Sequence, residues 1–102
     1  MTVMRLKKES PNPVQRIKEE ARRRIVETIG PEWKQQNILA RAAELHLKET
    51  RQTITGSESM ELDRILGLWD WVKSVRVASD VLESTLPGDF RDNRHWPMNP
   101  GL

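Results

Sequence analysis

The chain has 102 residues, of which 36% are hydrophobic and 31% are charged, and its formal net charge is +2. This length suits one domain with a small core, and the low apolar content favours an elongated or partner-dependent fold. The lack of cysteine excludes disulfides and thiolate metal sites, and no segment approaches the roughly 18 consecutive apolar residues of a membrane span. We therefore expect a soluble protein with no membrane segment.

Residues 1–11 predict a flexible N-terminal arm, because they follow neither a helical nor a strand period and end in Ser10-Pro11. The first 24 residues carry eight positive and three negative side chains, which gives this end of the chain a local charge of +5. Arg5, Lys7 and Lys8 in the arm are candidate contacts to an acidic surface of a partner. The alternative is that this charge is that of an ordinary solvated segment.

The first helix is predicted over residues 13–29. Asn12 can cap it, Pro13 suits its first position, and its apolar residues recur at spacings of three and four. Gly30-Pro31 ends this helix, because glycine favours the left-handed backbone of a helix terminus and proline can open the next helix. The second helix is predicted over residues 31–52. One line of apolar residues contains Ile38, Ala42 and Leu45. An adjoining set contains Leu39, Ala43 and Leu47.

The third helix is predicted over residues 58–84 and is the longest element. Two pairs could cap its start, Thr55 with Glu58 or Ser57 with Glu61, and the first pair has the better capping-box spacing. A turn signature, Pro87-Gly88, follows its end.

Two tryptophans on this helix cannot share a face. In the stretch LGLWDWV, residues 66–72, Trp69 and Trp71 lie two positions apart and therefore diverge by roughly 200°. One apolar line contains Trp69 and a second contains Trp71 and Val75, so the apolar sector exceeds the ~100° of a surface helix. We expect that two thin companion helices cannot cover it, and that Trp69, Trp71 and Val75 anchor a partner protein. The alternative is that both tryptophans contact the other two helices from opposite flanks of the groove.

Residues 87–102 predict an extended C-terminal tail that is rich in proline and asparagine. Within it, the motif RHWPMNP holds Trp96 in a stiffened peptide that could insert this side chain into a groove of a neighbouring subunit. The alternative is that Trp96 folds back on the chain's own helices. The predicted fold is thus all-α. A three-helix domain over residues 12–86, made of a helical hairpin and one long helix, lies between extended N- and C-terminal arms.

No pattern of catalytic, cofactor-binding or metal-binding residues emerges from the chain. His46 and His95 lie in no metal-ligand spacing, and the sequence lacks phosphate-binding glycine loops and nucleophile motifs. The run Arg22-Arg23-Arg24 places its side chains about 100° apart, and the third helix is too long and apolar to read bases. We therefore expect a protein that is not an enzyme, needs no cofactor and does not bind nucleic acid as its main role.

Two segments carry a resemblance to known proteins. The sequences RRRIVETIGPEWKQQNILARAAEL (22–45) and LWDWVKSVRVASDVLES (68–84) resemble small α-helical proteins and C-terminal helical domains encoded among bacteriophage tail and tail-fibre genes. This resemblance implies a virion structural protein that packs on tail, baseplate or fibre subunits, in several copies or as a homo-oligomer, and that is present in the host cytoplasm during assembly. Two alternatives remain open, a transient tail-fibre assembly chaperone and a basic nucleic-acid-binding helical regulator.

Overall fold

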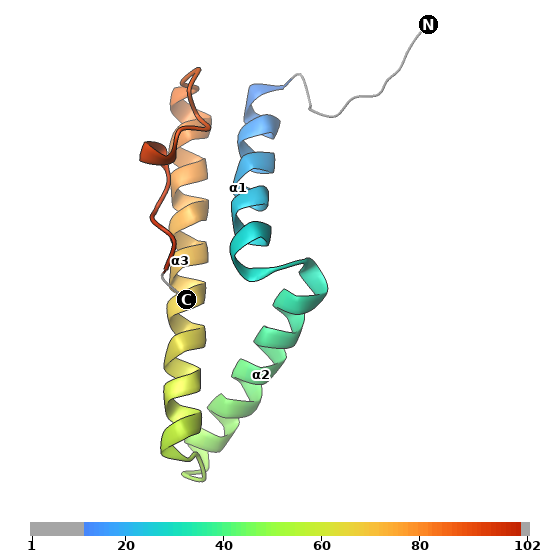
Figure 1. The fold of residues 1–102 in the computed structure, drawn as a ribbon, viewed down its shortest axis with the longest axis vertical. Coiled ribbons are helices and arrows are strands. Elements are labelled where there is room, and N and C mark those ends of the chain that lie inside the picture. The colour runs from blue at the N-terminus through green and yellow to red at the C-terminus, as the bar shows by residue number, and fades with distance from the viewer. Residues whose placement is uncertain (1–11, 101–102) are drawn as a thin grey trace, which may run out of the picture.

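The computed structural model describes residues 12–100, and within that range it contains three α-helices, one 3-10 helix and no strand (Figure 1). The elements are α1 (Pro13–Ile29), α2 (Glu32–Thr50), α3 (Gly56–Thr85) and the 3-10 helix η1 (Asn93–His95). The predicted all-α, three-helix arrangement is confirmed. The predicted N-terminal arm, residues 1–11, lies outside the described residues.

The first two helices follow one another along the third. α1 runs antiparallel to α3 beside its C-terminal half, and α2 slants toward the N-terminal half of α3 (Figure 1). Both helices pack on α3 far more than on each other, so they do not form a tight hairpin. The result is an elongated molecule with extents of 60 × 30 × 20 Å.

The break between α1 and α2 depends on Gly30. Its backbone angles are φ 122° and ψ −178°, a combination that only glycine adopts readily. The Gly30 N–H donates to the Val26 carbonyl at 2.8 Å, and its own carbonyl accepts from Gln35 Nε2 at 2.8 Å. At the other end of α1, Asn12 Oδ1 accepts from the Val14 N–H at 2.9 Å, as the sequence predicts. The backbone angles and hydrogen bonds of Gly30 therefore fix the point at which the chain turns from α1 into α2.

A capping box starts α3. Thr55 Oγ1 accepts from the Glu58 N–H at 3.1 Å, and the Glu58 carboxylate accepts from the Thr55 N–H at 3.0 Å. This is the pair with the better predicted spacing. The helix has 30 residues, which corresponds to about 45 Å, and it ends at Leu86 in the left-handed conformation.

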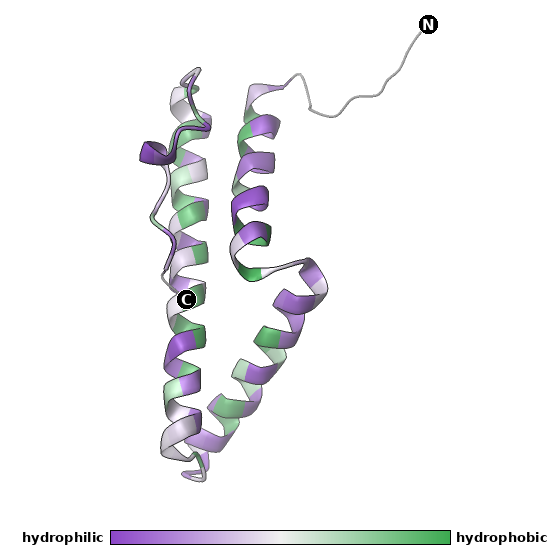
Figure 2. Cartoon of the chain, in the orientation of Figure 1, coloured by the Kyte–Doolittle hydropathy of each residue, from purple (hydrophilic) through white to green (hydrophobic). Residues whose placement is uncertain are grey.

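Two apolar clusters hold the helices together, and α3 contributes to both. Figure 2 shows hydrophobic residues, in green, along all three helices. The cluster between α1 and the C-terminal half of α3 also includes residues that follow α3 in sequence. The smaller cluster joins α2 to the N-terminal half of α3 through Leu45, Leu62 and Ile65. Ile38 and Trp69 pack against both clusters and so connect them.

Candidate protein-binding surface

The predicted partner anchors on α3 belong to the core of the protein. Trp71 is 8% exposed and Val75 is fully buried, and both lie in the larger cluster. Trp69 is partly buried where the two clusters meet. The expectation that the protomer cannot cover this second apolar face is therefore wrong for Trp71 and Val75. The two indoles do lie on different faces of α3, but both faces have partners within the chain.

The cover for Trp71 comes from the C-terminal segment. After Leu86 the chain turns and runs back along α3 (Figure 1), and Phe90 and Trp96 enter the larger cluster. Trp96 is 6% exposed, and its Nε1–H donates to the Phe90 carbonyl at 2.7 Å. The structure thus places Trp96 on the chain's own helices, as in the alternative to a docking tail.

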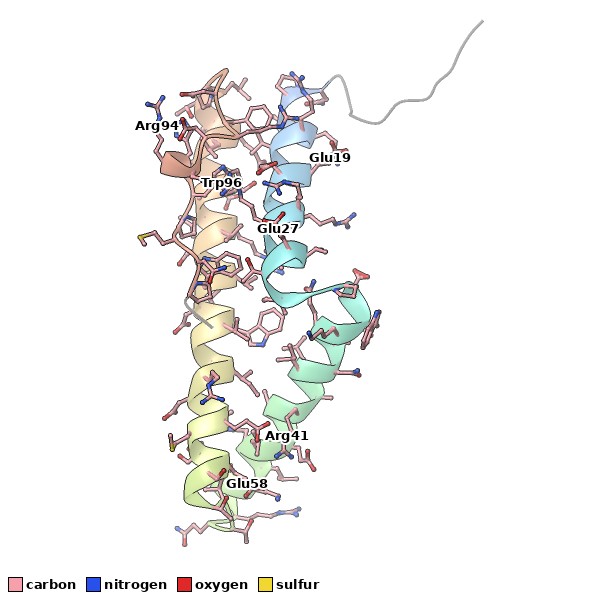
Figure 3. The ribbon with its side chains drawn as sticks, viewed as in Figure 1. Glu19, Glu27, Arg41, Glu58, Arg94 and Trp96 are labelled. Atoms are coloured by element: carbon pink, nitrogen blue, oxygen red, sulfur yellow. The ribbon has the colours of Figure 1, made fainter. Side chains whose placement is uncertain are left out.

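Arg24 connects α1 to this C-terminal segment. Its Nη2 donates to the Arg91 carbonyl at 2.8 Å and to Asn93 Oδ1 at 3.0 Å. Its guanidinium carbon lies 5.0 Å from the centroid of the ring of Trp96, which is labelled in Figure 3, and this is within the range of a cation–π contact. Arg24 Nε also donates to the buried Glu20 carboxylate at 2.7 Å. One side chain therefore anchors the segment to α1.

The buried Glu20 carboxylate is shared by two arginines. Arg23 donates to it at 2.7 and 3.0 Å, in addition to the Arg24 contact, and Arg23 also pairs with Glu27 at 2.8 Å. Burial raises the pKa of Glu20, but the hydrogen bonds and charges of Arg23 and Arg24 outweigh this effect, so the net pKa lies below its ordinary value. Two members of the predicted arginine run thus neutralise carboxylates of the same helix. This pairing weakens the case for a phosphate-binding stripe.

Each of the two histidines lies beside one carboxylate. Arg5, Lys7 and Lys8 lie outside the described residues. His46 lies 3.6 Å from Glu49, and His95 lies 2.9 Å from Asp89, in two separate pairs. Across residues 12–100, no three His, Cys, Asp or Glu side chains are grouped so that they could hold a metal ion.

An apolar surface that the sequence analysis did not single out lies on the outer side of α2. Six exposed residues recur there at spacings of three and four, and we call them the α2 outer stripe: Trp33, Gln36, Ala40, Ala43, Leu47 and Thr50. None of the six is charged. Trp33 is 66% exposed and Leu47 is 48% exposed, and Leu39, 49% exposed, lies at one edge of the stripe. This spacing keeps the six side chains on one face of the helix.

The opposite face of α2 fixes the direction in which this stripe points. Within Glu32–Thr50, which the structure describes throughout, Leu45 is the one buried residue, and it packs on α3. Arg41, which is labelled in Figure 3, donates to both carboxylate oxygens of Glu61 at 2.9 Å. Lys48 lies 2.6 Å from Glu58, and together with the Thr55 N–H it lowers the pKa of Glu58 to about 2. These contacts hold the inner face against α3 and leave the stripe facing solvent.

Exposed apolar residues also lie on the outer side of α3, where Val77 and Val81 are 62% and 56% exposed. On the outer side of α3, Leu66 and Val77 are separated by Asp70 and Lys73, which face the same direction. A groove of about 800 Å³ between α1, the start of α2 and α3 has charged residues of both signs along its walls. An ion pair of 3.2 Å between Lys18 and Glu83 spans the end of this groove. The α2 outer stripe differs from these surfaces in carrying an exposed tryptophan on a line of six residues that includes no charged side chain.

The signal for this stripe is present in the sequence. Ala43 and Leu47 adjoin the line that packs on α3, and Trp33 begins a 3–4–3–4–3 series that ends at Thr50. Periodicity alone indicates two apolar faces on this helix, but it does not say which face packs inward. The inner face is decided by Arg41 and Lys48, whose carboxylate partners come from α3.

A 330 Å³ cavity lies between α1 and the C-terminal segment, with Trp71 and Trp96 in its wall. The indole N–H groups of Trp69 and Trp71 are buried and have no hydrogen-bond partner among the described residues.

Comparisons of the chain with protein-family models, with curated proteins and with solved structures found no match. Between residues 12 and 100, none of the helices has the length and apolar character that crossing a membrane requires.

Proposed function

We propose that this chain is a non-enzymatic structural subunit that binds other proteins, and that it belongs to a bacteriophage tail, baseplate or fibre assembly. The observation that carries the protein-binding part is the α2 outer stripe, a charge-free apolar face on a helix whose opposite face is fixed to α3. The phage assignment depends on the resemblance of residues 22–45 and 68–84 to helical phage tail proteins.

The physical support is the cost of leaving this face in water. Trp33 is 66% exposed and Leu47 is 48% exposed, and both lie on a line of six residues that includes no charged side chain. At about 25 cal/mol per Å² of apolar surface, burying a half-exposed leucine and a two-thirds-exposed tryptophan against a partner contributes several kcal/mol. Contiguous apolar patches of this kind are typical of interaction surfaces. The rigid contacts of α2 with α3 also mean that binding needs little ordering of the helix.

A matched pair of variants tests the role of this surface. Leu47→Glu and Leu66→Glu change the same side chain at nearly equal exposure, 48% and 50%, on different helices. In phage produced with each variant, mass spectrometry of purified particles should find Leu47→Glu depleted by at least about tenfold, the effect of an apolar hot spot. Leu66→Glu should be incorporated as the unchanged chain is. Equal incorporation of both variants would contradict the assignment to α2.

The same measurement separates a virion subunit from an assembly chaperone. A subunit should be present in finished particles at a fixed ratio to the other tail proteins, whereas a chaperone should be present in infected cells and missing from particles. Absence of the unchanged chain from purified particles would therefore overturn the structural role.

A further inference from the structure

We infer that the α2 outer stripe binds the α2 outer stripe of a second copy of this chain, with the two helices antiparallel. The inference depends on the proposed function, because it names the partner of the same surface. A two-fold axis between Ala40 and Ala43 places each of these alanines opposite the other in the second copy. Two alanines at the centre allow the helix axes to approach closely.

The sizes of the side chains along the stripe favour this orientation. In the antiparallel pair, Trp33 lies opposite Thr50 of the second copy, and Gln36 lies opposite Leu47 of the second copy. Large residues thus face smaller ones at both ends, while alanine faces alanine in the middle. A parallel pair would instead place Trp33 against Trp33 of the second copy at one end. These two large rings would keep the helix axes apart, so that the central alanines could not approach closely. Packing therefore selects the antiparallel pair.

Charge also permits a second copy here. Because none of the six stripe residues is charged, self-pairing buries no like charges at its centre. Along one edge, Leu39 approaches Leu39 of the second copy near the two-fold axis. Along the other edge, Glu44 approaches its counterpart, a like-charge contact that opposes pairing and that Arg41, 2.8 Å from each Glu44 carboxylate, offsets in part. Antiparallel helices also bring opposite ends of their dipoles together.

The area of the stripe is enough for a weak dimer. Trp33 at 66% exposure and Leu39 and Leu47 at nearly half exposure, together with the four smaller stripe residues, present about 500 Å² per copy. Two copies then bury about 1,000 Å², which is the lower limit for a specific interface. We expect dissociation in the micromolar range, so that the dimer forms at the high local concentration of an assembly.

A charge-swap experiment on the full chain tests both the surface and the orientation. Ala40→Arg and Ala43→Glu each put a charge at the centre of the stripe, and both new residues are good helix formers. Sedimentation equilibrium of the unchanged chain should show a concentration-dependent rise from 11.9 kDa toward twice that mass. Each single variant should dimerise at least about 30-fold more weakly, because like charges meet near the two-fold axis. Circular dichroism checks that both variants stay helical.

Mixing the two variants gives the decisive result. In the antiparallel pair, the new guanidinium of one chain faces the new carboxylate of the other, so an equimolar mixture should recover the dimer. A monomeric unchanged chain up to several hundred micromolar, on the order of ten times a typical weak dissociation constant, would overturn the inference. Single variants that still dimerise would also overturn it, and a mixture that stays monomeric would overturn the antiparallel orientation. None of these results removes the chain from phage particles, so the proposed function is judged separately by its particle measurement.

Discussion

Replacing Trp96 with alanine tests whether the C-terminal segment is a structural part of the domain. Trp96 is 6% exposed, its Nε1–H bonds to the Phe90 carbonyl, and Arg24 lies over its ring. A tryptophan side chain buries about 200 Å², and Trp→Ala changes in cores cost about 3–5 kcal/mol. Because the whole segment can detach and limit the loss, we expect about 3 kcal/mol for Trp96→Ala.

Urea unfolding followed by circular dichroism at 222 nm measures this change, at protein concentrations where the chain is monomeric. Trp33→Ala is the matched control, since it removes the same side chain from a site that is 66% exposed, and we expect it to change stability by less than about 0.5 kcal/mol. Hydrogen exchange should also become faster in residues 87–100 of Trp96→Ala. Equal stability losses for the two variants would refute the assignment of Trp96 to the core.

Three further results follow from local geometry. In the folded chain the pKa of Glu58 is about 2, below its ordinary value of 4.5, so its contribution to stability is present above pH 4.5 and is lost as the pH falls toward 2; thermal melts should show a weaker acid dependence for Glu58→Gln. Gly30→Ala should cost about 2 kcal/mol in urea unfolding, because alanine is strained at φ 122°. A chain ending at Leu86 should expose Trp71 and self-associate more strongly than the unchanged chain in light scattering at the same concentration, and equal association of the two chains would contradict this expectation.

Local signals predicted the helices well. Asn12, Gly30-Pro31 and the Thr55–Glu58 pair act through backbone contacts a few residues away, so their effect can be worked out from the sequence. The predicted first helix has the observed bounds, and the second and third differ from α2 and α3 by one or two residues at each end. The resemblance to phage proteins stays a prediction.

The partners of the apolar faces were harder to predict, because they depend on long-range packing. The width of the apolar sector on α3 was a correct indication that the face around Trp71 needs a cover. Part of the cover comes from the segment that carries Trp96, which is 25 positions away and lies in a stretch whose composition resembles that of an unstructured tail. Arg24 holds the C-terminal segment on α1, but nothing in the run Arg22-Arg23-Arg24 indicates which arginine faces inward. The backbone carbonyl of Arg91 and the Trp96 ring select it.

The second apolar face is covered within the chain on α3 but not on α2. Each helix has apolar residues on two faces, and one face of each helix packs within the three-helix arrangement. The second face of α3 is covered by Phe90 and Trp96, which follow it in sequence and return along it. The second face of α2, from Trp33 to Thr50, has no such segment beside it among residues 12–100, because the C-terminal segment returns along α3 and α1. We therefore propose that the external partner first predicted for α3 binds α2 instead.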